Sequence, residues 1–268
     1  MTIDPADFSR LAPPKGARIA VVGACGGIGR AFTEAAVAIG LDIAALDLPS
    51  SLDEFPPANV KFAVALDATD EAQVEAAFAR VGRAFGGRLD GLVNLAGFPN
   101  RHVPFHELSL AEWQATIDGS LKTTYLCCRA AVPLLKASAA SGGAPAIVNT
   151  ASGLAARPLP GLSAYSASKA GVANFTKTLV HELAPHVRAN TLAPGVVRTA
   201  FHTGGTGRSA DSPNVQPRVD YENYAKLVPL NRVAEPADLV GPILFLLGPA
   251  SGWVNGQVLH VNGGGLMP

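Results

Sequence analysis

Short apolar runs alternate along this chain with longer segments of helical periodicity, and this alternation limits the fold more than any other feature. The runs are rich in Val, Ile and Ala without regular polar alternation, which is typical of parallel strands covered on both faces. We expect strands at residues 18–23, 41–47, 61–67, 89–97, 146–152, 187–192 and 256–261, and helices at 30–40, 70–85, 109–137, 163–184 and 236–247. This order predicts one α/β domain, a doubly wound parallel seven-stranded sheet with helices on both faces.

The composition excludes several classes of partner. The 268 residues include 21 Lys and Arg against 21 Asp and Glu, so no net charge favours nucleic acid or an anionic membrane. The longest apolar stretch, 243–247, is too short to span a membrane. We expect residues 1–15 to form a loose N-terminal leader without a secretory signal, and residues 16–268 to form the catalytic domain. Three cysteines without CxxC spacing favour a reduced, cytoplasmic protein without a metal site.

A glycine-rich turn joins the first expected strand to the first expected helix. The strand RIAVVG runs directly into GACGGIG at residues 23–29, and a helical pattern follows. Glycines let the backbone approach a ligand closely, and the N–H groups of a helix N-terminus attract phosphate. The segment therefore indicates a pyrophosphate site, although a tight strand-to-helix turn without a ligand would explain the same pattern.

An acidic residue ends the second expected strand. Asp47 lies 47 − 29 = 18 residues after the last glycine of the turn, close to the ~20 residues expected for an acid that binds the adenosine ribose. Its carboxylate can accept hydrogen bonds from both ribose hydroxyls and would repel a 2′-phosphate. No Arg or Lys occurs in the following LPSSLDEF, so NAD is favoured over NADP as the cofactor.

A serine, a tyrosine and a lysine follow the fifth expected strand at spacings of 165 − 152 = 13 and 169 − 165 = 4 residues. Residues four apart share one face of a helix, so Lys169 can place its ammonium beside the Tyr165 phenol. A nearby cation lowers the tyrosine pKa from about 10 toward the range of a general acid/base. Ser152 follows a strand, where its hydroxyl can hold a substrate oxygen. Taken alone, Tyr-x-x-x-Lys is more often an ordinary surface pair.

Together these motifs resemble the classical short-chain dehydrogenase/reductase family, from about Lys15 to the C-terminus. The matching segments are GACGGIG, Asp47, Asp67, NLAG at 94–97, Ser152 with YSASK, PGVVRT at 194–199 and GQVLHVNGG at 256–264. The resemblance implies a Rossmann-type domain and an NAD-dependent oxidoreductase that interconverts a secondary alcohol and a ketone by hydride transfer. It implies that Tyr165 is the general acid/base and that Ser152 holds the substrate oxygen. Lys169 would bind the nicotinamide ribose and lower the Tyr165 pKa.

The resemblance also implies a set of cofactor contacts at the strand ends. These cofactor-binding residues are Gly23, Cys25, Gly27, Ile28, Gly29, Asp47, Leu48, Asp67, Ala68, Asn94, Ala96, Gly97, Tyr165, Lys169, Pro194, Gly195, Val197 and Thr199. Asp67 and Ala68 would flank the adenine, and the 194–199 segment would hold the nicotinamide carboxamide.

Four positions depart from the family pattern. Val22, Leu95 and Asn262 replace a threonine, an asparagine and an aspartate, and we expect the fold to absorb these changes. Ser120 stands where the family has an asparagine that kinks the fourth helix and holds a water for proton relay to the lysine. The Gly119-Ser120 pair can preserve the bend with a different side chain. Ser120 is therefore a candidate catalytic residue, and the alternative is a buried helical serine without a relay role.

The substrate pocket is expected at the carboxyl ends of the strands, between the loops 98–106 and 154–162 and a substrate lid at 200–226. The candidate substrate-binding residues are Ser152, Leu154, Tyr165, Phe98, Arg157 and Phe201. A mostly apolar pocket favours a small, partly apolar or cyclic alcohol as the substrate.

Small residues on one side of the expected helix 163–184, namely Ala170, Gly171 and Ala173, favour a homotetramer, with a homodimer as the second possibility. Two other functions fit the sequence. An NADPH-dependent biosynthetic ketoreductase is disfavoured by Asp47. A non-catalytic NAD(H)-binding sensor or interaction protein is suggested by Ser120 and disfavoured by the retained serine, tyrosine and lysine.

Overall fold

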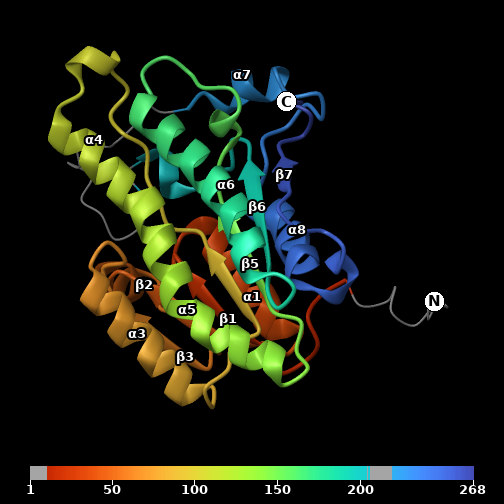
Figure 1. Ribbon diagram of the computed structural model, residues 1–268. Helices are drawn as coiled ribbons and strands as arrows, with labels where there is room; N and C mark the ends of the chain where they lie inside the picture. The colour runs from red at the N-terminus through yellow and green to blue at the C-terminus, as the bar shows by residue number, and fades with distance from the viewer. Residues whose placement is uncertain (1–10, 204, 206–218) are drawn as a thin grey trace.

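A single parallel sheet forms the centre of the molecule (Figure 1). The computed structural model describes residues 11–203, 205 and 219–268. Its strands are β1 Arg18–Val22, β2 Asp42–Asp47, β3 Phe62–Ala65, β4 Gly91–Asn94, β5 Ala146–Thr150, β6 Arg188–Pro194 and β7 Val258–Val261. Their order is β3-β2-β1-β4-β5-β6-β7, and every neighbouring pair is parallel. The predicted seven-stranded parallel sheet is confirmed.

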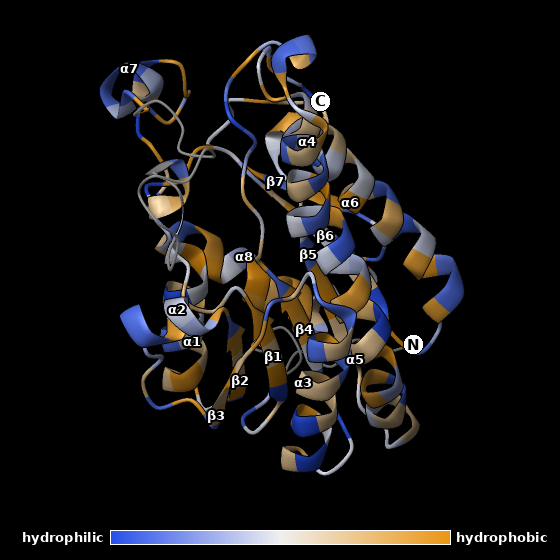
Figure 2. Cartoon of the chain, turned by 90° about the vertical axis from the view of Figure 1, so that its left-hand side faces the viewer, coloured by the Kyte–Doolittle hydropathy of each residue, from blue (hydrophilic) through white to orange (hydrophobic). Residues whose placement is uncertain are grey.

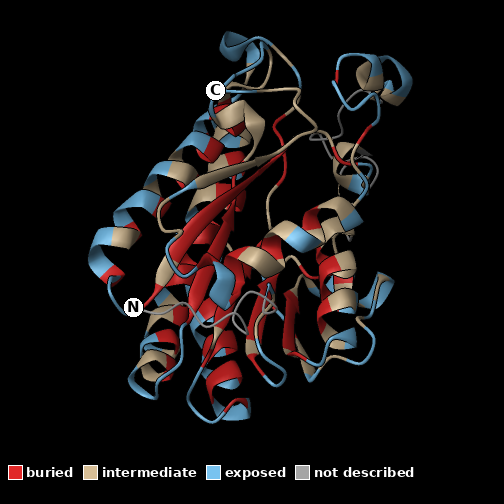
Figure 3. Ribbon diagram, turned by 90° about the vertical axis from the view of Figure 1, so that its right-hand side faces the viewer, coloured by how far each residue is buried: buried red, intermediate tan, exposed pale blue. Residues whose placement is uncertain are grey.

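Helices cover both faces of this sheet, as predicted. The longer ones are α1 Gly27–Ala38, α3 Glu71–Ala84, α4 Leu110–Ile117, α5 Thr123–Ala140, α6 Ser163–Leu183 and α8 Ala237–Leu247. Successive strand residues point to opposite faces, so β1 sends Ala20 into a core shared with α3, α5 and α6, and Ile19 into a core shared with α1 and α8. Figure 2 shows the apolar strands enclosed between the helix layers, and Figure 3 shows the central strands as continuously buried, whereas the edge strand β7 is only half-buried.

The strand order reverses at β1, which pairs with β2 on one side and with β4 on the other. At the carboxyl end of β1, Val22 lies opposite Leu46 of β2 and opposite Asn94 of β4. From β1 the chain continues to β2 and β3 on one side of the sheet, and from β4 it continues to β5, β6 and β7 on the other side. Such a reversal opens a crevice beyond the carboxyl ends of the strands, which is where ligands bind in sheets of this kind.

The long helix predicted at 109–137 is interrupted. It begins with α4, whose first turn is held by a capping box between Ser109 and Glu112. A π-helical turn, Asp118–Lys122, separates α4 from α5. Periodicity alone missed the interruption because a π turn inserts one residue without breaking the apolar pattern on either side.

Two short helices were not predicted, α2 Pro49–Glu54 and α7 Tyr221–Lys226. Each has six residues, too few to give a periodic signal in the sequence. The helix α7 lies in the segment 200–226 that was expected to be an irregular lid, and Ala200–Thr203 of that segment forms a 3₁₀ turn. Residues 204 and 206–218 of the lid, and residues 1–10 of the predicted leader, lie outside the described residues.

Candidate active site

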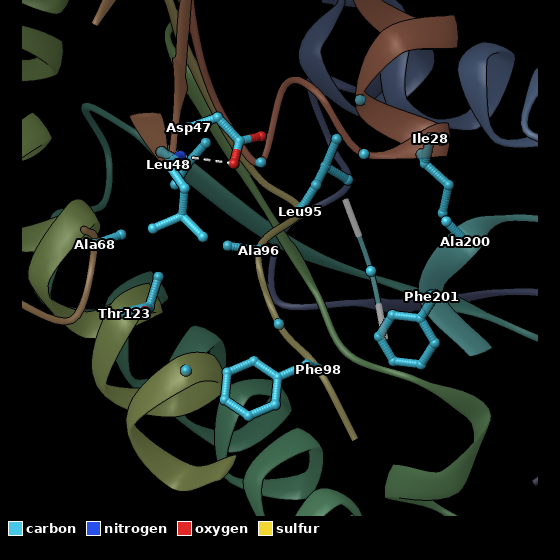
Figure 4. A pocket seen from close by; sticks show the side chains of 18 of the residues that line it. Ile28, Asp47, Leu48, Ala68, Leu95, Ala96, Phe98, Thr123, Ala200 and Phe201 are labelled. Atoms are coloured by element: carbon cyan, nitrogen blue, oxygen red, sulfur yellow. Dashed lines mark hydrogen bonds between the residues drawn. The ribbon is translucent and has the colours of Figure 1, made fainter. Parts of the chain in front are cut away.

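A cleft opens at the strand reversal, beyond the carboxyl ends of β1, β2 and β4 (Figure 4). It is lined by Val22, Gly23, Gly26, Gly27, Ile28, Gly29, Asp47, Leu48, Leu66, Asp67, Ala68, Thr69, Leu95, Ala96, Gly97, Phe98, Gly119, Thr123, Thr199, Ala200, Phe201 and Gly205. Eleven of the predicted cofactor-binding residues are in this lining: Gly23, Gly27, Ile28, Gly29, Asp47, Leu48, Asp67, Ala68, Ala96, Gly97 and Thr199.

The glycine turn packs so closely that side chains would not fit. A Cβ on Gly29 would lie 2.1 Å from the carbonyl oxygen of Gly23, and one on Gly27 would lie 2.5 Å from Cγ2 of Thr199. Gly23 has a φ of +84°, and a Cβ there would lie 2.8 Å from the backbone nitrogen of Ala96. The turn therefore brings the ends of β1, β4 and β6 together around the cleft.

The first turn of α1 is suited to a phosphate group. Its N-cap, Gly26, supplies no side-chain hydrogen bond, and the first turn contains no acidic residue. No side chain of the first turn therefore neutralises the positive N-terminus of this 12-residue helix. Because Gly26 and Gly27 line the cleft, the first N–H groups of the helix can bind an anionic ligand there. The pyrophosphate of a dinucleotide fits this end of the helix.

Asp47 is fixed by two backbone groups at the far end of the cleft. Its Oδ2 accepts a hydrogen bond from the N–H of Cys25 and its Oδ1 accepts one from the N–H of Leu48, both at 2.8 Å. A carboxylate has about four acceptor sites, so the two remaining sites suit the hydroxyls of a ribose. Close by, the Asp67 carboxylate accepts hydrogen bonds from the backbone and side chain of Thr69, and both residues line the cleft.

Several predicted cofactor residues lie outside the lining. Cys25 is fully buried, and its burial, with the charge of Asp47, raises the pKa of its thiol to about 12, so this thiol is neutral. Asn94 is turned into the core, where its Nδ2 donates to Oδ1 of Asn149 at 2.8 Å. Pro194 ends β6 opposite Val261, and Gly195, the next residue, lies so close to Asn262 that a Cβ on the glycine would be 3.0 Å from the Asn262 Cβ. Val197 is buried, forming a parallel bridge with Ala234.

Three of the four predicted catalytic residues, Ser152, Tyr165 and Lys169, lie together beside the cleft. Tyr165 and Lys169 sit one turn apart on α6 and are 7% and 3% exposed. The Lys169 Nζ lies 5.7 Å from the centre of the Tyr165 ring and donates to the carbonyl oxygen of Thr150 at 2.9 Å. Ser152, which follows β5, shares a hydrogen bond with the Tyr165 phenol and also accepts one from the N–H of Leu154.

The pKa of Tyr165 moves in the direction opposite to the one predicted. Burial raises it to about 12, and the hydrogen bond with Ser152 lowers it only in part. Burial also lowers the pKa of Lys169 to about 8. Proximity of a cation was the sole effect considered from the sequence, whereas loss of hydration is the larger effect for a phenol enclosed in the core. In the chain without ligands, both groups are therefore shifted toward their neutral forms.

Ser120 lies within the π turn, and its hydroxyl and the Lys169 ammonium both lie against Gly97. A Cβ on Gly97 would lie 3.0 Å from Nζ of Lys169 and 3.1 Å from Oγ of Ser120. The Ser120 Oγ is fully buried and has no hydrogen-bond partner among the described residues, so it does not bond back to its own helix. The π turn interrupts the helix at Gly119-Ser120, the pair at which the sequence allowed a bend.

Two phenylalanines close the end of the cleft away from Asp47 (Figure 4). Phe98 packs so tightly on the π turn that a Cβ on Gly119 would lie 2.1 Å from its ring. The Phe201 ring lies 5.8 Å from the ring of Tyr165, centre to centre. Of the other predicted substrate residues, Leu154 is half-buried and Arg157 is exposed in the loop before α6.

The three scaffold substitutions are absorbed, as expected. Val22 is buried at the end of β1, and Leu95 packs against the core between the sheet and α1. Asn262 holds the C-terminal turn, since its Oδ1 accepts from the N–H of Gly264 at 3.0 Å and its Nδ2 donates to the carbonyl of Leu266 at 2.8 Å.

Sequence reasoning did not name nine residues of the lining as site residues, of which Gly26 and Leu95 belong to the quoted motifs and the other seven lie outside them. The nine are Val22, Gly26, Leu66, Thr69, Leu95, Gly119, Thr123, Ala200 and Gly205. In the described part of the chain, no three His, Cys, Asp or Glu side chains are grouped so as to hold a metal ion. Nor is any helix among those residues long and apolar enough to cross a membrane.

The parallel sheet, the cleft at its strand reversal and the glycine turn define an α/β protein of the Rossmann type. Residues 23–265 match the family model described as Enoyl-(Acyl carrier protein) reductase. The chain is 36% identical to the D-threitol dehydrogenase of Mycolicibacterium smegmatis (91% of this chain, 90% of that protein). It is 34% identical to the cis-4-hydroxycyclohexanecarboxylate dehydrogenase of Sinomonas cyclohexanicum (92% and 96%).

A solved structure, a 3-ketoacyl-(acyl-carrier-protein) reductase from Brucella melitensis complexed with NADH, superposes with a TM-score of 0.83 at 27% identity, covering 94% of this chain and 99% of that one. The chain therefore belongs to the classical short-chain dehydrogenase/reductase family, as its motifs indicated, and is an oxidoreductase of the Rossmann type.

Proposed function

We propose that this protein is an NAD-dependent oxidoreductase that interconverts a secondary alcohol and a ketone. One observation carries the proposal: the Tyr165 phenol shares a hydrogen bond with Ser152 and has Lys169 one helical turn away, all beside a cleft with a fixed carboxylate at its far end. When bound, the nicotinamide would supply the chemistry of accepting or donating a hydride. The residues of the chain itself would transfer the proton.

We assign the proton transfer to Tyr165. In oxidation, the alcohol O–H proton moves to the phenolate oxygen of Tyr165 while the carbon gives up its hydride and the C–O bond becomes C=O. In reduction, the phenol returns that proton to the carbonyl oxygen. Ser152 is suited to hold the substrate oxygen, because its hydroxyl already bonds the phenol. Because burial raises the pKa of Tyr165 to about 12, the phenol is protonated, which is the form that donates in reduction. A cationic ligand and Lys169 would both favour the phenolate, which is the form that accepts the proton in oxidation.

The residues of the cleft fit a nicotinamide dinucleotide without a 2′-phosphate. The uncapped N-terminus of α1 suits the pyrophosphate, and the two fixed oxygens of Asp47 suit the adenosine ribose hydroxyls. Lys169 has three N–H donors, of which one is used by Thr150, so the lysine can bond the nicotinamide ribose as well. The NADH in the related Brucella reductase is consistent with this preference.

For the substrate, we propose a small, partly apolar or cyclic alcohol. Phe98 and Phe201 make the end of the cleft beside Tyr165 apolar. One of the relatives is named for a hydroxylated cyclohexane ring and another for a short polyol, and both names describe secondary alcohols. Because Arg157 is exposed, it is a weaker candidate for holding a substrate carboxylate than it was from the sequence.

A homotetramer or homodimer remains our proposal for the assembly, and the cytoplasm our proposal for the compartment. On α6, Ala167 and Ala170 are exposed and leave room for another chain, whereas Gly171 faces Leu121 of its own chain, 2.8 Å from a Cβ placed on the glycine. The three free cysteines are consistent with a reducing compartment. Light scattering that detects only a 27.5 kDa species would overturn the assembly.

Thermal unfolding with NADH and, separately, NADPH tests the cofactor preference. A ligand at 100 times its Kd adds about 2.7 kcal/mol to the stability of the folded state, which is roughly 5–10 °C in Tm. We expect the larger shift with NADH. A larger shift with NADPH would favour an NADPH-dependent biosynthetic ketoreductase. An NADH shift without turnover of any alcohol or ketone would favour a sensor.

A further inference from the structure

Asn100 is a fully buried asparagine in the loop after β4, and its amide is bonded at both ends. Its Oδ1 accepts a hydrogen bond from the backbone N–H of Tyr165 at 3.0 Å. Its Nδ2 donates to the carbonyl oxygen of Gly161 at 3.0 Å and to that of Arg101 at 2.7 Å. One side chain therefore connects the loop after β4 both to the loop before α6 and to the catalytic tyrosine itself.

The helix α6 has no capping side chain of its own. Its N-cap residue is Leu162, which provides no side-chain hydrogen bond, and Tyr165 is the third residue of the helix. The N–H at this third position is one that a capping side chain commonly satisfies, and leaving it unpaired in a buried site costs free energy. Asn100 thus acts as a cap supplied from 65 residues away in the sequence.

The loop that carries Asn100 also forms part of the cleft. Gly97 and Phe98 line it, and Gly97 lies against both the Lys169 ammonium and the Ser120 hydroxyl. Four consecutive residues, 97–100, therefore contact the cleft, the lysine and the tyrosine backbone.

A second set of contacts locks this loop to the loop before α6. The N–H of Val103 donates to the carbonyl oxygen of Gly161 at 3.3 Å. Gly161 has a φ of +83°, and a Cβ there would lie 2.7 Å from the ring of His102. These contacts tie the two loops to each other, and Asn100 extends the connection into the first turn of α6.

We propose that Asn100 is a positioning residue for the reaction proposed above: its amide fixes the first turn of α6, and with it the Tyr165 phenol, relative to the cleft. The role rests on the proposed function, and it is a positioning role because Asn100 is not among the residues that line the cleft. Displacement of a catalytic group by about 1 Å can cost about 100-fold in rate, so a single buried bond to the tyrosine backbone can control turnover.

The test compares Asn100→Ala and Asn100→Asp with a matched control, Asn190→Ala. Asn190, in β6, is also fully buried and also connects two backbone segments. It accepts a hydrogen bond from the N–H of Gln257 at 3.0 Å and donates one to the carbonyl oxygen of Val254 at 2.8 Å, both in the segment before β7. Amide hydrogen exchange in the full chain gives a readout that needs no turnover. We expect Asn100→Ala to speed exchange at residues 163–169 and the control to leave those residues unchanged.

Steady-state kinetics with NAD⁺ and cis-4-hydroxycyclohexanecarboxylate, D-threitol or cyclohexanol give the second readout. We expect Asn100→Ala to lower kcat about tenfold or more with the Kd for NADH unchanged, and Asn190→Ala to lower the Tm without changing kcat. Asn100→Asp keeps an acceptor for the Tyr165 N–H, so it should retain more activity than the alanine variant.

Unchanged exchange at 163–169 in Asn100→Ala, or equal loss of kcat in Asn100→Asp and Asn100→Ala, would overturn the positioning role. An unmodified chain without turnover on any probe would overturn the proposed function instead, and the exchange measurement would still decide whether Asn100 fixes the helix.

Discussion

The Asp47 carboxylate accepts a hydrogen bond from the backbone N–H of Cys25, with 2.8 Å between the nitrogen and Oδ2. The acid at the end of β2 is thereby tied to the glycine turn at the end of β1. Leu48 holds the other carboxylate oxygen, so neither oxygen can turn away from the cleft without losing a bond. This fixed negative charge is the structural basis for the proposed preference for NAD over NADP.

Removal of that charge should change the cofactor preference. Asp47→Asn keeps an acceptor oxygen but loses the charge, so we expect NADH affinity to fall about tenfold or more and the ratio of NADPH to NADH affinity to rise. Fluorescence titration with both reduced cofactors measures this ratio. Asp42→Asn is the control, because Asp42 starts the same strand, is not part of the cleft lining and forms an exposed ion pair with Lys61 at 3.7 Å. An unchanged ratio in Asp47→Asn would remove Asp47 from cofactor recognition.

The buried Lys169 should make stability depend on pH in a specific window. Because burial lowers its pKa to about 8 from an ordinary 10.5, the folded chain binds fewer protons than the unfolded chain between those values. The unfavourable contribution is fully present below pH 8 and disappears as the pH rises to 10.5. Lys169→Met should therefore gain stability relative to the unmodified chain most clearly below pH 8.

Urea unfolding at pH 7 and pH 10 measures this difference. The gain for Lys169→Met should be smaller at pH 10 than at pH 7, while turnover is lost at both. A gain that grows with pH would show that the ammonium is not desolvated in the folded chain.

The variant Ser120→Ala should lower activity without lowering stability. The Ser120 Oγ has no partner among the described residues, so Ser120→Ala removes an unpaired buried hydroxyl and should leave the Tm unchanged or slightly higher. If the hydroxyl holds a water beside Lys169, kcat should fall about tenfold or more. Ser138→Ala on α5 is the control, because Ser138 is buried and bonded to Asp90, and its loss should lower the Tm without changing kcat. Full activity in Ser120→Ala would assign Ser120 a structural role alone.

Gly119→Ala should disturb the cleft through Phe98. The added Cβ would lie 2.1 Å from the Phe98 ring, so the ring must move, at a cost of about 1–3 kcal/mol in unfolding free energy. Because Phe98 lines the cleft, the NADH-induced shift in Tm should also shrink. Gly241→Ala in α8 is the matched control, since no atom lies within 4 Å of its Cβ position and the change should stabilise the helix slightly. Equal Tm values for the two variants would contradict the tight packing.

The sheet was predictable because the strands are apolar on both faces and the helices between them follow a strong period. The glycine turn and Asp47 were predictable because phosphate and ribose sites need those residue types at a known spacing. The π turn could not be predicted, because one inserted residue at Gly119-Ser120 leaves the flanking pattern intact.

The direction of the Tyr165 pKa and the role of Asn100 depend on tertiary burial. Spacing within a helix places Lys169 near Tyr165, but it does not reveal that both are enclosed by the sheet and the loops. Asn100 belongs to no motif, and its partner Tyr165 is 65 residues away, so no local pattern connects them.

The most direct test of the central claim is the turnover of Tyr165→Phe beside its binding of NADH. The probes are NAD⁺ with cis-4-hydroxycyclohexanecarboxylate, D-threitol and cyclohexanol. We predict that the unmodified chain reduces NAD⁺ with at least one of them. Tyr165→Phe should keep the NADH-induced shift in Tm and lose about 100-fold or more in kcat, because only the proton-transferring hydroxyl is removed. Equal kcat for the two proteins would contradict the assignment of Tyr165 as the acid/base.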